Sequence, residues 1–163
     1  MSLAVVSRNE NVRNHRFVLR RSWLPNRRGI VNFVMLNPST ADEVFDDPTV
    51  RRCVGFGKRW GFSGLVVTNL FAYRATDPAE LQGLASRDLH LAIGDGNDAN
   101  LVEQAQVAEV VVCAWGDHGS LMGRDTAVRQ LLLGRQLFCI RKSKRGLPVH
   151  PVRERYTEEP VLL

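Results

Sequence analysis

Two asparagines stand at the ends of strongly apolar segments of the chain. Asn37 follows residues 29–36, and Asn69 lies near the end of the apolar run 64–70. An amide side chain both donates and accepts hydrogen bonds, so two such groups could recognise the edge of a nucleobase or of a similar planar ligand. Capping of a loop is the alternative explanation for each asparagine taken alone. Their joint occurrence favours a ligand site.

A loop rich in carboxylates follows the first asparagine. Residues 42–47 carry four acidic side chains, Asp42, Glu43, Asp46 and Asp47. Such a group could bind a divalent cation or supply a general base, although its spacing differs from that of an EF-hand. Asp47 precedes a proline and fits the usual cap of a helix, so Asp42 and Asp46 are the candidates for water activation.

Two histidines and one tryptophan complete the candidate chemistry. Trp115-Gly116 could form a flat wall on which a base stacks, with the glycine allowing close approach; packing in the core is the alternative for Trp115. His118 and His150 are the candidate titrating groups near neutral pH. His150 lies in a basic loop rich in Gly and Pro, a setting less typical of a core histidine, and is therefore the stronger candidate.

The elements that would position these residues alternate between strands and helices. Apolar runs predict strands, and apolar residues at helical spacing between proline and glycine boundaries predict helices. The expected strands are 17–19, 29–36, 64–70, 109–114 and 136–140. The expected helices are 48–61, one or more short helices after Asp77-Pro78, 100–107 and 121–133.

This alternation predicts the fold class. Apolar strands that alternate with helices are typical of a largely parallel sheet covered on both faces. The turn-rich residues 23–26 suit an antiparallel connection between the first two strands. We therefore expect one α/β domain over residues 1–163, a three-layer sandwich with a mostly parallel central sheet and an N-terminal antiparallel strand.

In such sheets, ligands bind beyond the carboxyl ends of the strands, where loops and helix N-termini converge. Polar residues follow four of the expected strands, at 37–42, 69–74, 115–120 and 146–151. One site at this edge is therefore predicted. Its catalytic candidates are Asn37, Asp42, Asp46 and His150. Its substrate-binding candidates are Pro38, Ser39, Thr40, Phe45, Asn69, Arg74, Trp115, Gly116 and His118.

The composition excludes several classes of protein. With 44% hydrophobic and 24% charged residues, neither a disordered tail nor a collagen-like or disulfide scaffold fits. No apolar run reaches the roughly 18 residues of a membrane span. Residues 1–4 lead directly into basic positions, without the apolar core of a secretory signal. A cytoplasmic protein with no membrane partner is expected.

The cysteines and histidines give no sign of a metal site. Cys53, Cys113 and Cys139 are widely spaced, and two of them lie inside apolar runs, so we expect buried thiols. The four histidines are equally scattered, whereas a zinc site wants paired ligands at short spacing. No metal and no cofactor is expected.

The charge of the chain points to an anionic partner. Lys and Arg total 22 against 17 Asp and Glu, which gives a net charge of +5, and the basic residues cluster at 8–28 and 141–155. Most of them are arginines, whose planar fork suits phosphate and carboxylate. A nucleic acid or a nucleotide is therefore the expected partner. A solvated basic face is the alternative.

Motifs along almost the whole chain resemble an uncharacterised bacterial and phage family known as a domain of unknown function. They are Leu36-Asn37-Pro38-Ser39-Thr40-Ala41-Asp42, Asp47-Pro48-Thr49, the segment Asn69 to Thr76, Asn97-Asp98, Trp115-Gly116 and His150-Pro151. This resemblance is specific for membership of the family. It brings no established activity.

A more distant resemblance concerns the uracil-DNA glycosylase superfamily. Four landmarks occur in the order seen there: Leu36-Asn37-Pro38, a strand ending in Asn69, an apolar strand ending in Trp115-Gly116, and Val149-His150-Pro151. The chain departs from that pattern after the last landmark, where Val152-Arg153 stand in place of a Ser-Pro and a wedge residue. Phe45 is the candidate for the aromatic stacking residue.

The glycosylase resemblance implies a fold and a reaction. It implies a uracil-DNA glycosylase-like fold in which Asn37 positions a hydrolytic water, Asn69 hydrogen-bonds a flipped base and His150 stabilises charge on the departing base. Hydrolysis of an N-glycosidic bond is accordingly the preferred hypothesis. A non-catalytic nucleotide- or nucleic-acid-binding module, a metal-assisted hydrolase built on residues 42–47, and a protein of this fold with an unrelated substrate are the alternatives.

Overall fold

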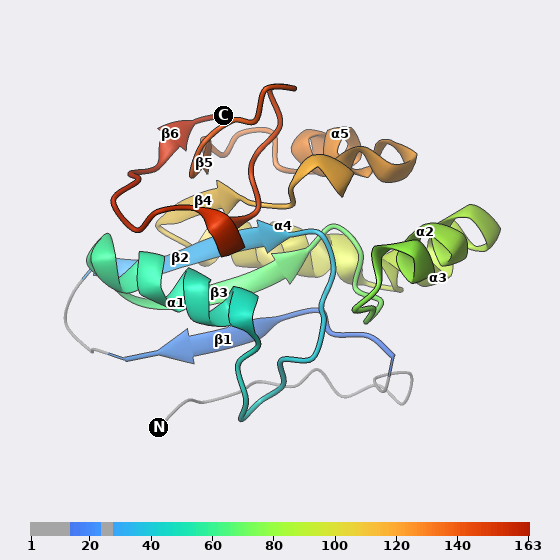
Figure 1. The fold of residues 1–163 in the computed structure, drawn as a ribbon, viewed down its shortest axis with the longest axis horizontal. Coiled ribbons are helices and arrows are strands. Elements are labelled where there is room, and N and C mark those ends of the chain that lie inside the picture. Colours follow the sequence, from blue (N-terminus) through green and yellow to red (C-terminus); the bar gives the residue numbers. More distant parts are fainter. Residues whose placement is uncertain (1–13, 24–27) are drawn as a thin grey trace.

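The computed structural model describes residues 14–23 and 28–163, which form a six-stranded sheet with helices on both faces (Figure 1). The strand order is β1-β3-β2-β4-β5-β6. The strands are β1 (Leu19–Ser22), β2 (Arg28–Met35), β3 (Phe62–Asn69), β4 (Val110–Cys113), β5 (Leu137–Cys139) and β6 (Val161–Leu162). The α-helices are α1 (Pro48–Arg59), α2 (Pro78–Arg87), α3 (Leu89–Ile93), α4 (Asn97–Val107) and α5 (Arg124–Leu131), and the short 3₁₀ segments are η1 (Asp117–Gly123) and η2 (Pro151–Arg153).

The centre of the sheet is parallel, as the sequence predicts. β2 lies between β3 and β4, and β5 continues the parallel set beyond β4. The chain first crosses from β2 through α1 to β3, and then returns through α2, α3 and α4 to β4 on the other side of β2. The direction of winding therefore reverses between β2 and β4. This reversal creates the crevice at which open α/β sheets bind ligands.

Helix α1 forms where its boundary residues require it. Asp47 is the N-cap and accepts a hydrogen bond from the Val50 amide at 2.8 Å, with Pro48 at the first helical position. The helix ends at Trp60, followed by Gly61 at φ +83°. An L residue rarely adopts this backbone conformation, so the glycine ends the helix. The predicted helix 48–61 is confirmed.

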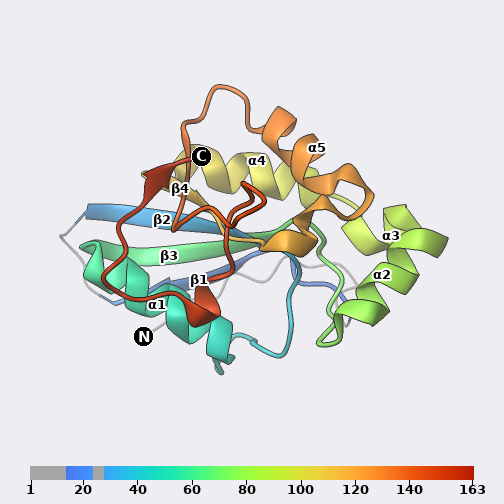
Figure 2. The ribbon, with the colours of Figure 1, turned by 45° about the horizontal axis from the view of Figure 1, so that its top comes forward.

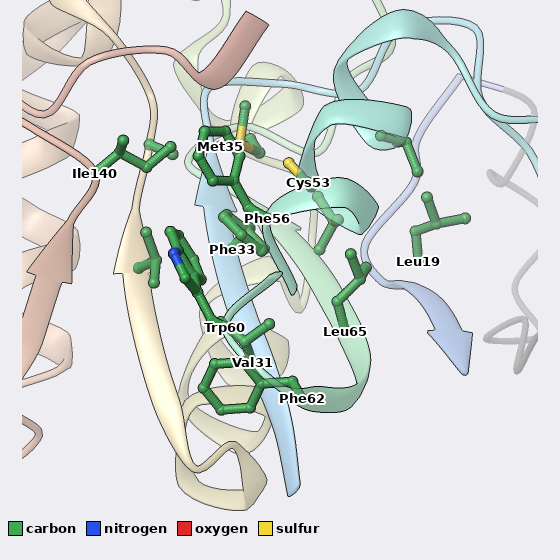
Figure 3. Packing of buried hydrophobic residues seen from close by; sticks show 14 of the residues in the cluster. Leu19, Val31, Phe33, Met35, Cys53, Phe56, Trp60, Phe62, Leu65 and Ile140 are labelled. Atoms are coloured by element: carbon green, nitrogen blue, oxygen red, sulfur yellow. The ribbon is translucent and has the colours of Figure 1, made fainter. Parts of the chain in front are cut away.

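In Figure 2, α1 lies on one face of the sheet, and α4 and α5 lie on the other. A hydrophobic cluster covers each of these two faces. On the α1 face, Phe33, Phe56 and Trp60 pack together, with the Phe33 and Trp60 rings 5.8 Å apart (Figure 3). Leu101 and Val128 pack on the opposite face. A helical layer thus lies on each face of the sheet, which confirms the mixed α/β fold.

All three cysteines are buried free thiols, as expected. Burial raises the pKa of Cys53, Cys113 and Cys139, so the thiol form is favoured at each position. Cys113 and Cys139 are neighbours in the parallel ladder between β4 and β5.

The N-terminal strand is antiparallel, as expected, but its position differs from the expected hairpin. β1 begins at Leu19, where the sequence predicts a strand at 17–19, and it pairs with β3. Both edges of β2 are already paired, with β3 and with β4. No edge of β2 therefore remains for β1. Residues 24–27 of the expected turn lie outside the described residues, as do residues 1–4 and residues 8–13 of the basic cluster 8–28.

The expected helix 121–133 is only partly correct. Leu121 (ψ +122°) and Met122 (φ +52°) have non-helical backbones, and α5 begins at Arg124. The preceding residues form η1 instead. Further upstream, α4 begins at Asn97, three residues before the expected start.

The C-terminal strap, residues 151–163, contains η2 and β6, neither of which is among the expected elements. β6 pairs antiparallel with β5 at the edge of the sheet. Between η2 and β6 the strap crosses α1 (Figure 1). There the Tyr156 ring meets the Phe56 ring edge to face, with centroids 5.0 Å apart, and the Trp60 indole donates to the Glu158 carbonyl at 3.0 Å. In the described residues, no helix is long and apolar enough to cross a membrane.

Candidate functional site

The carboxyl ends of β2, β3 and β4 point towards the side of the molecule that carries α2 and α3 (Figure 1). The loop after β2 is tied there to the loop after β3. The Asn37 amide donates to the carbonyls of Ala75 (2.8 Å) and Pro38 (3.0 Å), and the Ala75 amide donates to the Pro38 carbonyl at 3.0 Å. The Asn37 Nδ2 group is thus used to hold the two loops together. Its Oδ1 is the atom with which it could orient a water.

The remainder of the 37–45 segment has a mixed environment. The hydroxyls of Ser39 and Thr76 lie 3.2 Å apart and add a second link between the two loops. Thr40 is exposed, and Phe45 is 71% exposed. Phe45 therefore covers no part of the core and is free to stack on a ligand.

The carboxylates of the acidic loop are engaged in local structure. Asp42 accepts from the amides of Val44 and Phe45 at 2.8 and 2.7 Å, and these hydrogen bonds hold its pKa below the usual range. Asp46 pairs with Arg21 at 2.8 Å. Together with the Asp47 cap, these contacts account for three of the four acidic groups.

A metal site at this loop gains no support from these contacts. Over residues 14–23 and 28–163, no cluster of three or more His, Cys, Asp or Glu side chains is arranged to hold a metal ion. Water activation by Asp42 or Asp46 would have to compete with the hydrogen bonds that each already accepts.

Asn69 lies at the carboxyl end of β3 and is only 1% exposed. Leu65 and Val67 face the α1 cluster, so strand alternation directs Asn69 to the same face. Within residues 14–23 and 28–163, neither Oδ1 nor Nδ2 of Asn69 has a hydrogen-bond partner. A buried amide without partners costs free energy, so this position calls for a ligand or water.

Trp115 is a core residue and does not form the exposed wall that the sequence allowed. It is 2% exposed and packs in the cluster on the α4 face, and its Nε1 has no hydrogen-bond partner in the described part of the chain. Gly119 lies directly against its indole, because a Cβ at position 119 would fall 2.0 Å from Trp115 Cδ1. The indole is thus enclosed by its own loop.

Gly116 and His150 do meet at the carboxyl edge. A Cβ built on Gly116 (φ +74°) would lie 3.4 Å from the His150 Cβ. His150 is half-buried, and its Nδ1 accepts from the Val152 amide at 3.3 Å as the cap of η2. Burial lowers the pKa of His150, and the negative charge of Asp47, which acts to raise it, offsets only part of this effect. The neutral ring therefore keeps its proton on Nε2, which is left as a donor.

A pocket of about 240 Å³ lies at the reversal between β2 and β4. Its lining comes from the end of β2, the first turns of α2, η1 and the loop after β5. The lining residues are Leu36, Pro78, Leu81, Gln82, Asp117, His118, Ser120, Leu121 and Arg145. His118 is the one sequence-predicted site residue among them.

Sequence reasoning missed four polar residues of this pocket. Asp117 and Ser120 follow β4, within the polar segment 115–120 that the sequence places at the carboxyl edge of the sheet. Their position after a strand is therefore the signal that could have identified them. Gln82 and Arg145 carry no such signal. They reach the pocket because α2 and the 141–149 loop are folded over the same edge of the sheet.

The predicted residues thus fall into separate groups. Asn69 and His150 belong to the α1 side of the carboxyl edge, and His118 lines the pocket on the α2 side. The expectation that Asn37, Asn69, Trp115 and His150 share one open cleft does not hold, because Asn69 and Trp115 are buried.

Fold and pocket together define a doubly wound α/β protein with a small pocket at its switch point. Residues 16–152 match the family described as "Protein of unknown function (DUF1643)", and the chain belongs to this family. No curated protein matches the chain, and no solved structure matches it either. The expected family membership is therefore confirmed.

Proposed function

We propose that this protein binds a nucleotide or the end of a nucleic acid in the pocket between β2 and β4. The observation that supports this most strongly is the pocket's place at the switch point, where α/β sheets bind ligands. Its size suits a small planar group and leaves little room for a larger one.

The lining of the pocket supplies the chemistry that such a ligand requires. Leu36, Pro78 and Leu121 give apolar surfaces for the faces of a ring. Gln82 and Ser120 offer both donors and acceptors for its edge. Arg145 adds a guanidinium, which suits an anionic phosphate attached to the ring.

Calorimetry with nucleoside monophosphates and the matching nucleosides tests the proposal. Arg145→Ala should weaken monophosphate binding about tenfold or more, as expected for the loss of a charged hydrogen bond, and should leave nucleoside binding nearly unchanged. Arg59→Ala is the matched control, because Arg59 is exposed in the last turn of α1, away from the pocket lining. Absence of binding by every nucleotide, or equal binding by Arg145→Ala, rejects the proposal.

Hydrolysis of an N-glycosidic bond is a second candidate, favoured by His150 and Asn69. A neutral His150 with its Nε2 proton available could donate to charge that develops on a departing base. The unpartnered Asn69 amide at the same face of the edge could pair with that base if the surrounding loops open. The uracil-DNA glycosylase-like fold and the water-positioning role of Asn37 belong to this candidate.

Purified protein should then cleave uracil- or mismatch-containing oligonucleotides. His150→Ala should lower the cleavage rate by about two orders of magnitude or more, as is typical for the loss of a hydrogen-bond donor to a developing anion. A protein that leaves these oligonucleotides intact and does not retard them in a gel is not such a glycosylase. A non-catalytic binding module would lose affinity steeply with salt and tolerate both Asn37→Ala and His150→Ala.

A further inference from the structure

We propose that Arg16 and Arg74 form an oxyanion-binding site, separate from the pocket, that takes a phosphate group. The two side chains converge on one atom. Arg16 Nη1 donates to the Ala41 carbonyl at 2.7 Å, and Arg74 Nη1 donates to the same oxygen at 3.1 Å.

The backbone brings the two arginines together. Segment 14–16 runs antiparallel to segment 72–74, with the Arg16 amide donating to Ala72 and the Arg74 amide donating to Asn14. Arg16 and Arg74 are thus diagonal neighbours on one face of this short ladder. His15 and Tyr73 occupy the other face, where their rings meet edge to face at 5.6 Å.

The pair has more positive charge and more donors than its protein partners use. A guanidinium carries five N–H donors, whereas the side chain of each arginine is hydrogen-bonded, in the part of the chain that the structure describes, to a single neutral carbonyl. Arg16 is only 8% exposed, and its buried Nε has no hydrogen-bond partner among the residues that the structure describes. Among the described residues, neither arginine forms an ion pair with a carboxylate.

The nearby carboxylates are occupied elsewhere. The charges of Asp42 and Asp47 act on Arg16 from a distance, but Asp42 accepts from the amides of Val44 and Phe45 and Asp47 accepts from those of Val50 and Ala41. Burial and the adjacent Arg74 charge lower the pKa of Arg16 to about 10, so Arg16 stays charged at neutral pH. A bound anion would relieve the repulsion between the two cations.

Phosphate fits this arrangement well. Two guanidiniums side by side can each give paired N–H donors to a tetrahedral oxyanion, which a single ammonium cannot do. The partly exposed Arg74 provides the route of access, since Arg16 is almost fully buried. The inference is independent of the ligand of the pocket, which has its own cation, Arg145.

Titration with inorganic phosphate at constant ionic strength, held with chloride, tests the site by calorimetry and by thermal unfolding. Wild-type protein should bind phosphate and unfold at a higher temperature as phosphate rises. Arg74→Ala should weaken phosphate binding at least tenfold and abolish the phosphate-dependent shift. Arg74→Lys keeps the charge but loses the planar fork, so its affinity for phosphate should lie between those of wild type and Arg74→Ala. If Arg74→Ala does not fold, Arg74→Lys is the variant that tests the site.

The controls separate this site from the pocket and from a structural role. Arg59→Ala should bind phosphate as wild type does, and in Arg145→Ala, which lacks the cation of the pocket, phosphate binding should still depend on Arg74. If the arginines only clamp the loop at Ala41, Arg74→Ala lowers the unfolding temperature without changing the phosphate-dependent shift, and the proposal is overturned. The same holds if phosphate acts no differently from chloride. Competition by a dinucleoside monophosphate would assign the site to a phosphodiester, and lack of competition would assign it to a free phosphate.

Discussion

Asp47 shows how one side chain can couple a loop to a helix. Its Oδ1 caps α1 through the Val50 amide, and its Oδ2 accepts from the Ala41 amide at 3.3 Å. The Asp-Pro pair in the sequence predicts the first contact, because Pro at the first helical position and Asp before it are local signals. The second contact depends on where the 37–47 loop folds back, which no local pattern specifies.

Asp47→Ala should destabilise the protein by about 1–2 kcal/mol, since it removes the cap and also leaves a buried amide unpaired. Asp77→Ala is the matched comparison, because Asp77 caps α2 through a single amide and is exposed. Its cost should be smaller, about 0.5–1 kcal/mol. Urea unfolding of both variants measures the difference, and equal costs would contradict the second role of Asp47.

His150 should make stability depend on pH. Its pKa is lower in the folded protein than in the unfolded chain, because burial disfavours the charged ring. The unfolded chain therefore binds more protons, and stability falls as the pH drops through the unfolded value of about 6.5. At higher pH the ring is neutral in both the folded and the unfolded chain, so His150 no longer lowers the stability.

The variant His150→Asn isolates this effect. Its side-chain oxygen can still accept from the Val152 amide, but it does not titrate. Between pH 8 and pH 5 the wild type should lose more stability than the variant, as measured by urea unfolding. Parallel pH profiles for the two proteins would show that His150 is not the group responsible.

At the scale of elements, the C-terminal strap packs closely on α1 at Gly55, where the absence of a side chain leaves room for Tyr156. A Cβ at Gly55 would lie 2.4 Å from the Tyr156 ring, closer than real contacts allow. Arg52 stacks on the same ring, with its guanidinium carbon 3.9 Å from the ring centre. The sequence gives α1 its boundaries, whereas the need for glycine at position 55 exists only because the strap crosses there.

Gly55→Ala should therefore destabilise the protein by about 1–3 kcal/mol through overpacking. In a Tyr156→Ala background the same substitution should become stabilising by up to about 1 kcal/mol, because alanine is the better helix former. Gly83→Ala in α2 is the control: apart from its chain neighbours and the backbone of its own helix, no described residue has an atom within 4 Å of its Cβ position, so the substitution should stabilise the wild-type chain by a similar amount. Additive effects at positions 55 and 156 would argue against the contact.

At the scale of the whole molecule, the two hydrophobic clusters share one sheet. Trp60 packs on the α1 face and Trp115 on the opposite face. Since β2 and β4 each contribute side chains to both clusters, the loss of one cluster should disrupt the other.

Unfolding by urea should therefore be a single transition. Variants in which Trp60 or Trp115 is the only tryptophan should give fluorescence midpoints that coincide with the midpoint from circular dichroism in the same variant. Two separated transitions would contradict the prediction of a single domain over residues 1–163.

The sequence by itself determined which segments become strands and helices and which residues bound them. Apolar runs, Asp-Pro caps at Asp47 and Asp77, and Gly61 act over a few residues, so they can be recognised locally. It also determined that polar groups follow several of the parallel strands.

Only the tertiary structure decided which of those groups meet. It placed β1 beside β3, enclosed Trp115 against Gly119 and buried Asn69. It also brought Gln82 and Arg145 to the switch-point pocket and joined Arg16 to Arg74 at one carbonyl. The physical reason is that these contacts depend on the direction in which the chain winds across the sheet, and that direction is set by the packing of the whole core.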